Sequence, residues 1–301
     1  MTNNFSGPER DLVGYGRDLP KVNWPGGAKV AVSIVVNYEE GSERSFANND
    51  ELNEGLGELN RPVDTQYRDL ATESVYEYGS RTGIHRIMRI LKSHGIRCTF
   101  FAAAVALEKN PSVAEWIREE NHEPCAHGWR WAEDWKLSID EQRARIKMAV
   151  ESIQQTCGQR PVGWYSRWMP SINTRELLVE EGGFLYDSDA YNDDLPYYVN
   201  VGNTSHLVVP YGLTYNDVRY VSGNFSAPSD FFETCRRALD LLIKEGQEFP
   251  KMMSIGLHPR WSGQAGRASA LDEFIEYAKG TGDVWFATRR EIAETWNAQF
   301  K

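Results

Sequence analysis

Long hydrophobic runs are missing from this sequence. No stretch of about 18 apolar residues occurs, so no membrane-spanning helix is expected. The first residues also lack a basic head followed by an apolar segment, so we expect no secretory signal and a cytoplasmic protein. Positive charge is in deficit too, because 33 Lys and Arg stand against 43 Asp and Glu, a formal net charge of −10. This balance argues against nucleic acid or an anionic membrane as the partner.

Paired cysteines and nucleotide-binding motifs are absent as well. None of the cysteines forms a C-x-x-C pair, so a zinc knuckle is excluded and reduced thiols are expected. The four are Cys98, Cys125, Cys157 and Cys235. No G-x-G-x-x-G follows a predicted strand and no Walker motif occurs, which leaves a nucleotide-binding fold without support.

Strand-like and helix-like segments alternate along most of the chain. The apolar run at residues 28–36 is typical of a strand buried on both faces. Residues 80–94 carry apolar side chains at helical spacing and end before Gly95, which favours an amphipathic helix. About seven such alternations predict parallel strands joined by crossover helices. We therefore expect an α/β fold, a distorted (β/α) barrel of seven to eight parallel strands.

Capping residues and turn signals set further boundaries. Ser138-x-x-Glu141 and Thr288-x-x-Glu291 are capping boxes that predict helix starts. Further strands are predicted at residues 97–103, 123–126, 162–164, 184–186, 207–211, 251–257 and 284–286. Residues 1–27 predict an irregular N-terminal arm, residues 42–72 a long loop, and residues 28–301 a single catalytic domain.

Polar side chains follow several of the predicted strands. In barrels of this class the active site lies at the C-terminal ends of the strands. Glu39 and Glu40 follow the first strand, His127 the third, and His258 the strand at 251–257. One glutamate can act as general base and the other as an orienting group, while a histidine can bind a metal or a substrate oxygen. We predict these four as the catalytic group, against the alternative of surface charge and structural histidines.

A second set of side chains near the same strand ends is predicted to bind substrate. Arginines suit a carboxylate, a carbonyl or a developing oxyanion. Tryptophans beside polar groups indicate a small aromatic-walled pocket, unless they belong to the core. An aspartate in the acidic segment 187–194 either orders the site or forms a local turn. The set consists of Arg130, Trp131, Tyr165, Arg167, Asp187 and Arg260.

From residue 11 to residue 296 the chain resembles the polysaccharide deacetylase superfamily, and within it the allantoinase-like and cyclic-imide-hydrolase-like branch. The strings that carry the resemblance are N-Y-E-E-G at 37–41, E-S-V-Y-E-Y-G-S-R-T-G at 73–83, H-G-W-R-W at 127–131, N-D-V-R-Y at 216–220 and K-M-M-S-I-G-L-H at 251–258. The resemblance implies a distorted β/α barrel and hydrolysis of non-peptide C–N bonds. It also implies assembly as a dimer or tetramer, with residues 1–27 and 42–72 as candidate contacts.

The resemblance also implies roles for individual residues. Glu39 matches the base of a T-F-D-D-G-like motif, and Glu40 matches its metal ligand. Two metal-binding histidines four residues apart match His127 and Trp131, so the third ligand is missing at Trp131. The expectation is therefore either no required cofactor or one zinc ion held by Glu40 and His127. His258 matches the residue that protonates the leaving nitrogen.

Three functions stay open on the sequence. The first is a hydrolase that opens a small cyclic amide such as a ureide, a hydantoin or an imide. The second is a metal-dependent polysaccharide N-deacetylase, and the third is a non-catalytic relative that binds small molecules. The incomplete metal set favours the first. The expected partners are a small-molecule amide and further copies of the chain in a homo-oligomer.

Overall fold

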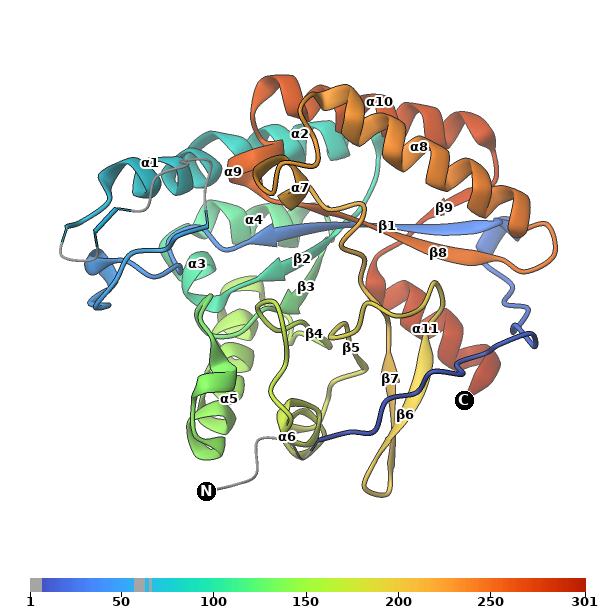
Figure 1. The fold of residues 1–301 in the computed structure, drawn as a ribbon, viewed down its shortest axis with the longest axis horizontal. Helices are drawn as coiled ribbons and strands as arrows, with labels where there is room; N and C mark the ends of the chain where they lie inside the picture. Colours follow the sequence, from blue (N-terminus) through green and yellow to red (C-terminus); the bar gives the residue numbers. More distant parts are fainter. Residues whose placement is uncertain (1–6, 57–62, 65–66) are drawn as a thin grey trace.

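A curled nine-stranded sheet forms the centre of the structure, a computed structural model that describes residues 7–56, 63–64 and 67–301 (Figure 1). The strand order is β6-β7-β5-β4-β3-β2-β1-β8, and β9 pairs with the first part of β1. The strands are β1 Val30–Tyr38, β2 Thr99–Ala102, β3 Glu123–Ala126, β4 Gly163–Trp164, β5 Tyr186–Asp187, β6 Tyr197–Val201, β7 Thr204–Val208, β8 Lys251–Leu257 and β9 Val284–Phe286. Within the described residues β6 and β8 do not pair, so the sheet is a half-barrel, which confirms the expected distorted barrel.

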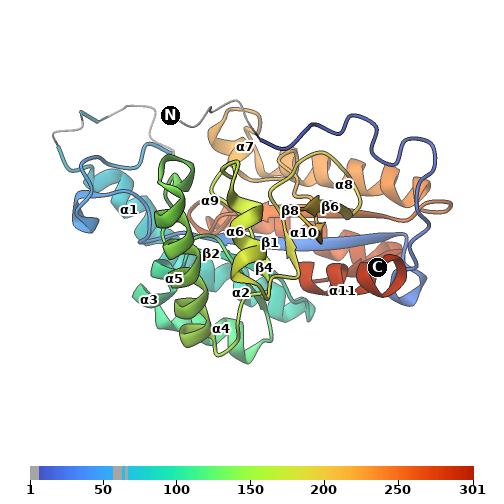
Figure 2. The ribbon, with the colours of Figure 1, turned by 90° about the horizontal axis from the view of Figure 1, so that it is seen from below.

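Helices cover the sheet on both sides. In Figure 1, α2, α8 and α10 lie above β1 and α11 lies below it, while Figure 2 shows α5 and α6 side by side. The helices are α1 Leu70–Tyr78, α2 Ile84–His94, α3 Ala104–Lys109, α4 Pro111–Glu119, α5 Ile139–Cys157, α6 Thr174–Glu181, α7 Val218–Val221, α8 Pro228–Glu245, α9 Pro259–Ser262, α10 Ala265–Thr281 and α11 Arg289–Phe300. A π-helical turn, Gly79–Gly83, joins α1 to α2. No described helix has both the length and the apolar character needed to cross a membrane.

Several boundaries agree with the expectations from the sequence. Both capping boxes form, at Ser138 before α5 and at Thr288 before α11. Gly95 ends α2 in the left-handed conformation, with φ of 67°, as a C-terminal glycine allows. Strands β3, β8 and β9 have the predicted bounds.

Five of the named helices and strands were missed, namely β6, α1, α3, α7 and α9. The predicted strand at 207–211 corresponds to β7, Thr204–Val208. It forms an antiparallel hairpin with the unexpected β6, so not every neighbouring pair of strands is parallel. Helix α3 was absent from the expectation, and α1 begins inside the predicted loop, where Asp69 caps it by accepting from Ala71 N and Thr72 N. Residues 57–62 and 65–66 of that loop lie outside the described residues, as do residues 1–6 of the predicted arm. The division into arm and domain stays a prediction.

Two apolar cores lie on opposite faces of the sheet. Along β1, Val32, Ile34 and Val36 pack toward the helices, while Ala31 and Val35 belong to the core inside the curl. All nine residues of β1 are buried, as the continuous apolar run predicted. This alternation decides which side chains beyond the strand ends face the interior.

Candidate active site

The two consecutive glutamates after β1 point in different directions. Neighbouring residues on a strand face opposite sides, so Glu39 continues the inner set of β1 and Glu40 the outer set. Glu39 meets His127 and His258 inside the curl. Glu40 instead accepts a hydrogen bond from the backbone N–H of Arg260 (3.2 Å). Glu40 and His127, which were expected to hold a zinc ion together, therefore face different sides of the strand end.

Glu39 is the centre of the site, and its side chain is almost fully buried. Oε1 lies 3.2 Å from His127 Nε2 and 3.5 Å from His258 Nε2. Oε2 lies 2.7 Å from a guanidinium nitrogen of Arg260. Burial by itself would raise the pKa of Glu39, but the charges of Arg260 and His258 and the contact with His127 hold that pKa well below its ordinary value. Glu39 is therefore an ionised carboxylate in position to accept a proton.

His258 is held by Asp217. Its Nδ1 lies 2.6 Å from Asp217 Oδ1, and its backbone N–H donates to Asp217 Oδ2 at 2.6 Å. Burial opposes the charged imidazolium, but the carboxylates of Asp217 and Glu39 outweigh it and raise the pKa of His258 to about 9. At neutral pH His258 therefore carries a proton that it can give up.

Asp217 is a functional candidate that the sequence reasoning missed. It follows no predicted strand, and its only signal was its place in the N-D-V-R-Y string at 216–220. An isolated parallel bridge between Asn216 and Gly256 brings it beside β8. Gly256 is required there, because a Cβ at this position would overlap the side chains of Tyr211 and Asn216.

His127 is fixed by Tyr165. Its Nδ1 donates to the Tyr165 carbonyl oxygen (2.7 Å), and the two rings stack at 5.0 Å between centroids. Because a carbonyl only accepts, Nδ1 carries a hydrogen and Nε2 is the atom turned to Glu39. The Tyr165 side chain, a predicted substrate contact, thus orients a histidine and bonds through its hydroxyl to Tyr191.

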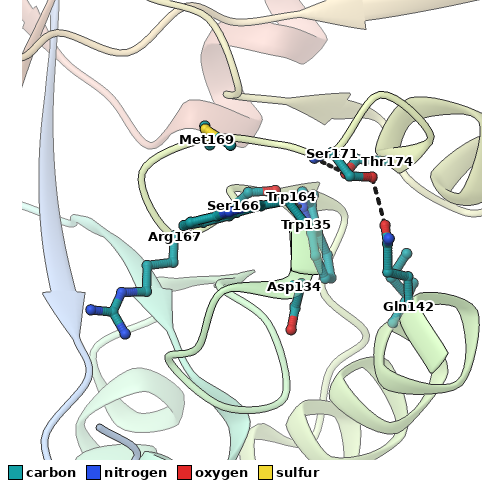
Figure 3. Close-up of a pocket in the computed structure, with 10 residues that line it drawn as sticks. Asp134, Trp135, Gln142, Trp164, Ser166, Arg167, Met169, Ser171 and Thr174 are labelled. Atoms are coloured by element: carbon teal, nitrogen blue, oxygen red, sulfur yellow. Dashed lines mark hydrogen bonds between the residues drawn. The ribbon is translucent and has the colours of Figure 1, made fainter. Parts of the chain in front are cut away.

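The predicted substrate-binding arginines are occupied by carboxylates of the protein. Arg130 pairs with Asp50 (2.6 Å) and Arg167 with Glu54 (2.8 Å), both on the loop after β1. The Arg167 guanidinium also lies over the rings of Trp131 and Trp168. In the pocket of Figure 3, it points away from Trp135 and Trp164. Only Arg260 of the three reaches Glu39.

The Asp187 carboxylate is also committed to internal partners. It is fully buried and contacts Arg175 (2.8 Å) and His206 (3.0 Å). Its neighbour Asp189 accepts from both the backbone and the hydroxyl of Ser166. Asp187 and Asp189 therefore order the loop after β4, and neither contributes a free carboxylate to the site around Glu39.

The residues at this site do not fit a zinc ion. Trp131 stands where the resemblance places a second histidine, and its ring is buried in the core on the helix side, 6.3 Å from that of Tyr76. Glu40 and His127 do not converge, and the described part of the chain contains no group of three His, Cys, Asp or Glu side chains that could hold a metal. Zinc needs about four such ligands or three with an open position.

Comparison with known proteins identifies relatives over the whole length. A sequence profile described as "Polysaccharide deacetylase" matches residues 72–170. A Schizosaccharomyces pombe protein named "Putative polysaccharide deacetylase" is 39% identical, covering 96% of this chain and 97% of its own. The crystal structure of a PuuE allantoinase is 43% identical with a TM-score of 0.93, covering 98% and 99%. That of a probable polysaccharide deacetylase from Pseudomonas aeruginosa PAO1 is 42% identical with a TM-score of 0.92, covering 97% and 98%.

Proposed function

The chain belongs to the polysaccharide deacetylase family, and we propose that within this family it hydrolyses the C–N bond of a small cyclic amide such as a ureide, a hydantoin or an imide. The family consists of hydrolases that act on C–N bonds other than peptide bonds. The observation that carries the proposal is the pairing of ionised Glu39 with protonated His258, 3.5 Å apart, at a site that does not fit a metal. The similarity to an allantoinase over the whole chain supports the cyclic amide.

Glu39 and His258 supply the two proton transfers that such a hydrolysis needs. Glu39 takes a proton from water, which attacks the carbonyl carbon of the amide. His258 gives its proton to the departing nitrogen, so that the C–N bond breaks without expelling an amide anion. Asp217 keeps His258 oriented and protonated. The positive charge of His258 favours the oxyanion of the tetrahedral intermediate.

The second candidate function is N-deacetylation of a polysaccharide. It is favoured by the names of the S. pombe relative and of the P. aeruginosa structure. The reaction is chemically close, since both break an amide C–N bond after attack by water. The residues around Glu39 argue against the metal-dependent form of this reaction, because Glu40 and Trp131 do not complete a ligand set.

A turnover screen with a chelator separates the two functions. Purified protein is offered allantoin, substituted hydantoins, cyclic imides and acetylated chito-oligosaccharides, each with and without a chelator. Chelator-resistant ring opening of one cyclic amide is the expected result. Acetate release from the oligosaccharide, abolished by the chelator, would replace the proposal by the second candidate.

The proposal extends to the setting of the enzyme. All four cysteines are free and buried, which supports a reducing compartment such as the cytoplasm. We expect a homo-oligomer, a dimer or tetramer, with a small-molecule substrate and no nucleic acid or membrane partner. Light scattering on the purified chain measures the number of subunits directly.

A further inference from the structure

Arg260 is a fully buried cation placed between the two consecutive glutamates. One guanidinium nitrogen lies 2.7 Å from Glu39 Oε2 and another 3.5 Å from Glu40 Oε1. The side chain is 0% exposed. A single guanidinium therefore faces both of the buried carboxylates that follow β1. Burial of either carboxylate without a nearby cation would cost free energy of folding.

An aromatic cage surrounds the guanidinium. Its central carbon lies 4.3 Å from the ring centre of Trp261, 4.5 Å from that of Tyr76 and 5.3 Å from that of Trp131. Aromatic faces attract a cation, the more so where water is excluded. Nε and Nη2 of Arg260 make no hydrogen bond of good geometry within the described residues. What Arg260 supplies at Glu39 is therefore chiefly its charge.

The fold contains specific close contacts that place Arg260 here. The short helix α9, which carries it, lies against the π-helical turn Gly79–Gly83. A Cβ at Gly83 would overlap the carbonyl of Pro259, and a Cβ at Gly79 would come within 2.8 Å of the Arg260 backbone nitrogen. The two glycines of the E-Y-G-S-R-T-G string thus allow α9 to approach closely enough for the guanidinium to reach both carboxylates.

We propose that Arg260 is the permanent cation of this active site, occupying the position between the carboxylates that would otherwise need a divalent metal. The inference rests on the proposed role of Glu39 as general base, which Arg260 keeps ionised and oriented. Arg260 is thus a positioning residue that acts through Glu39. While it is in place, a metal ion bound to Glu39 would lie beside a fixed positive charge, because the guanidinium is only 2.7 Å from Glu39 Oε2. The chain therefore excludes zinc by electrostatic repulsion as well as by the absence of ligands.

Zinc binding tests the inference without reference to any substrate. The wild-type chain, Arg260→Ala and the double variant Arg260→Ala with Trp131→His are dialysed against zinc, and bound metal is measured. We expect no stoichiometric zinc in the wild type and a gain in the double variant, where the guanidinium is gone and an imidazole is added. One tightly held zinc per wild-type chain would overturn the inference.

Kinetics supply the second readout. Arg260→Ala should lower kcat by roughly a hundredfold or more, as the loss of one preorganised charge does elsewhere. Added ethylguanidinium should restore part of kcat, zinc should not, and Arg260→Lys should stay more active than Arg260→Ala. A folded Arg260→Ala with wild-type kcat contradicts the inference. If Arg260→Ala does not fold, Arg260→Lys and the wild-type zinc measurement decide.

A matched control separates the role in the site from burial alone. Arg289 is another fully buried arginine, but its guanidinium bonds to the hydroxyls of Ser188 and Ser254 and to backbone carbonyls. Arg289→Ala should destabilise the fold without any gain in zinc binding. If no amide in the screen is turned over, the proposed function is wrong. The zinc measurements still test whether Arg260 keeps a metal ion out of the site.

Discussion

The imidazole of His258 lies 2.6 Å from the carboxylate of Asp217, a residue 41 positions earlier in the chain. Two hydrogen bonds join the pair, one from the ring and one from the backbone of His258. The contact fixes the ring with Nε2 toward Glu39, so one carboxylate sets both the orientation and the charge of the proposed acid.

The pH dependence of kcat/KM follows from this pair. His258 must be protonated to act as acid, and its pKa is raised to about 9, so activity should fall as the pH rises through about 9. The acid limb should lie below the ordinary range of a glutamate, because Glu39 must be ionised and its pKa is lowered. Asp217→Asn should move the alkaline limb toward the ordinary histidine value of about 6.5. An unchanged profile in that variant would remove His258 from the role of acid.

The two glutamates should differ in their effect on catalysis. Glu39→Gln keeps the shape of the side chain but removes the base, and we expect kcat to fall by about 10²- to 10⁴-fold in a variant that still folds. Glu40→Gln lies outside the contacts to the two histidines and should reduce kcat less. The two variants are matched controls for each other. Equal losses in kcat would mean that Glu40 has a chemical role that its position does not suggest.

Gly83→Ala tests the close approach of α9. The added methyl would overlap the Pro259 carbonyl, so α9 must move and take Arg260 with it, at a cost of about 1–3 kcal/mol. Stability by denaturant and kcat should both fall. Gly280, inside α10, is the control, since a Cβ there meets nothing within 4 Å and alanine should stabilise the helix by up to about 1 kcal/mol. Unchanged kcat in a folded Gly83→Ala protein would mean that the position of Arg260 does not depend on the close contact at Gly83.

Arg167 and Glu54 form a buried ion pair whose loss should loosen the loop after β1. Removing one partner should cost about 3–5 kcal/mol, because the other charge stays buried without compensation. Glu54→Gln and Arg167→Met should therefore lower stability and kcat together, and replacing both residues should recover part of the stability. The exposed pair Arg143–Glu180 is the control, worth at most about 1 kcal/mol. If Arg167→Met lowers kcat without lowering stability, Arg167 would instead act directly on the oxyanion of the intermediate.

Local patterns in the sequence were sufficient for most elements near the site. The continuous apolar runs of β1 and β8, the capping boxes and Gly95 each depend on residues within one or two turns, and each is confirmed. The regular alternation of side chains along a strand explains why Glu39 and His258 both face the interior. The antiparallel hairpin β6–β7 was missed because β6 is a short strand that is only partly buried.

The partners of the charged side chains could not be found in this way. Arg130, Arg167 and Arg260 looked equivalent on the sequence, but two of them bind the loop after β1 and one binds Glu39. Ion pairs across 80 to 221 positions depend on how α9 and the loops pack, and no local pattern contains that information. The sequence by itself determined that acidic, basic and histidine side chains follow the ends of β1, β3 and β8. Only the tertiary structure decided that Asp217 charges His258 and that a guanidinium faces both glutamates, because a pKa depends on distances that folding alone sets.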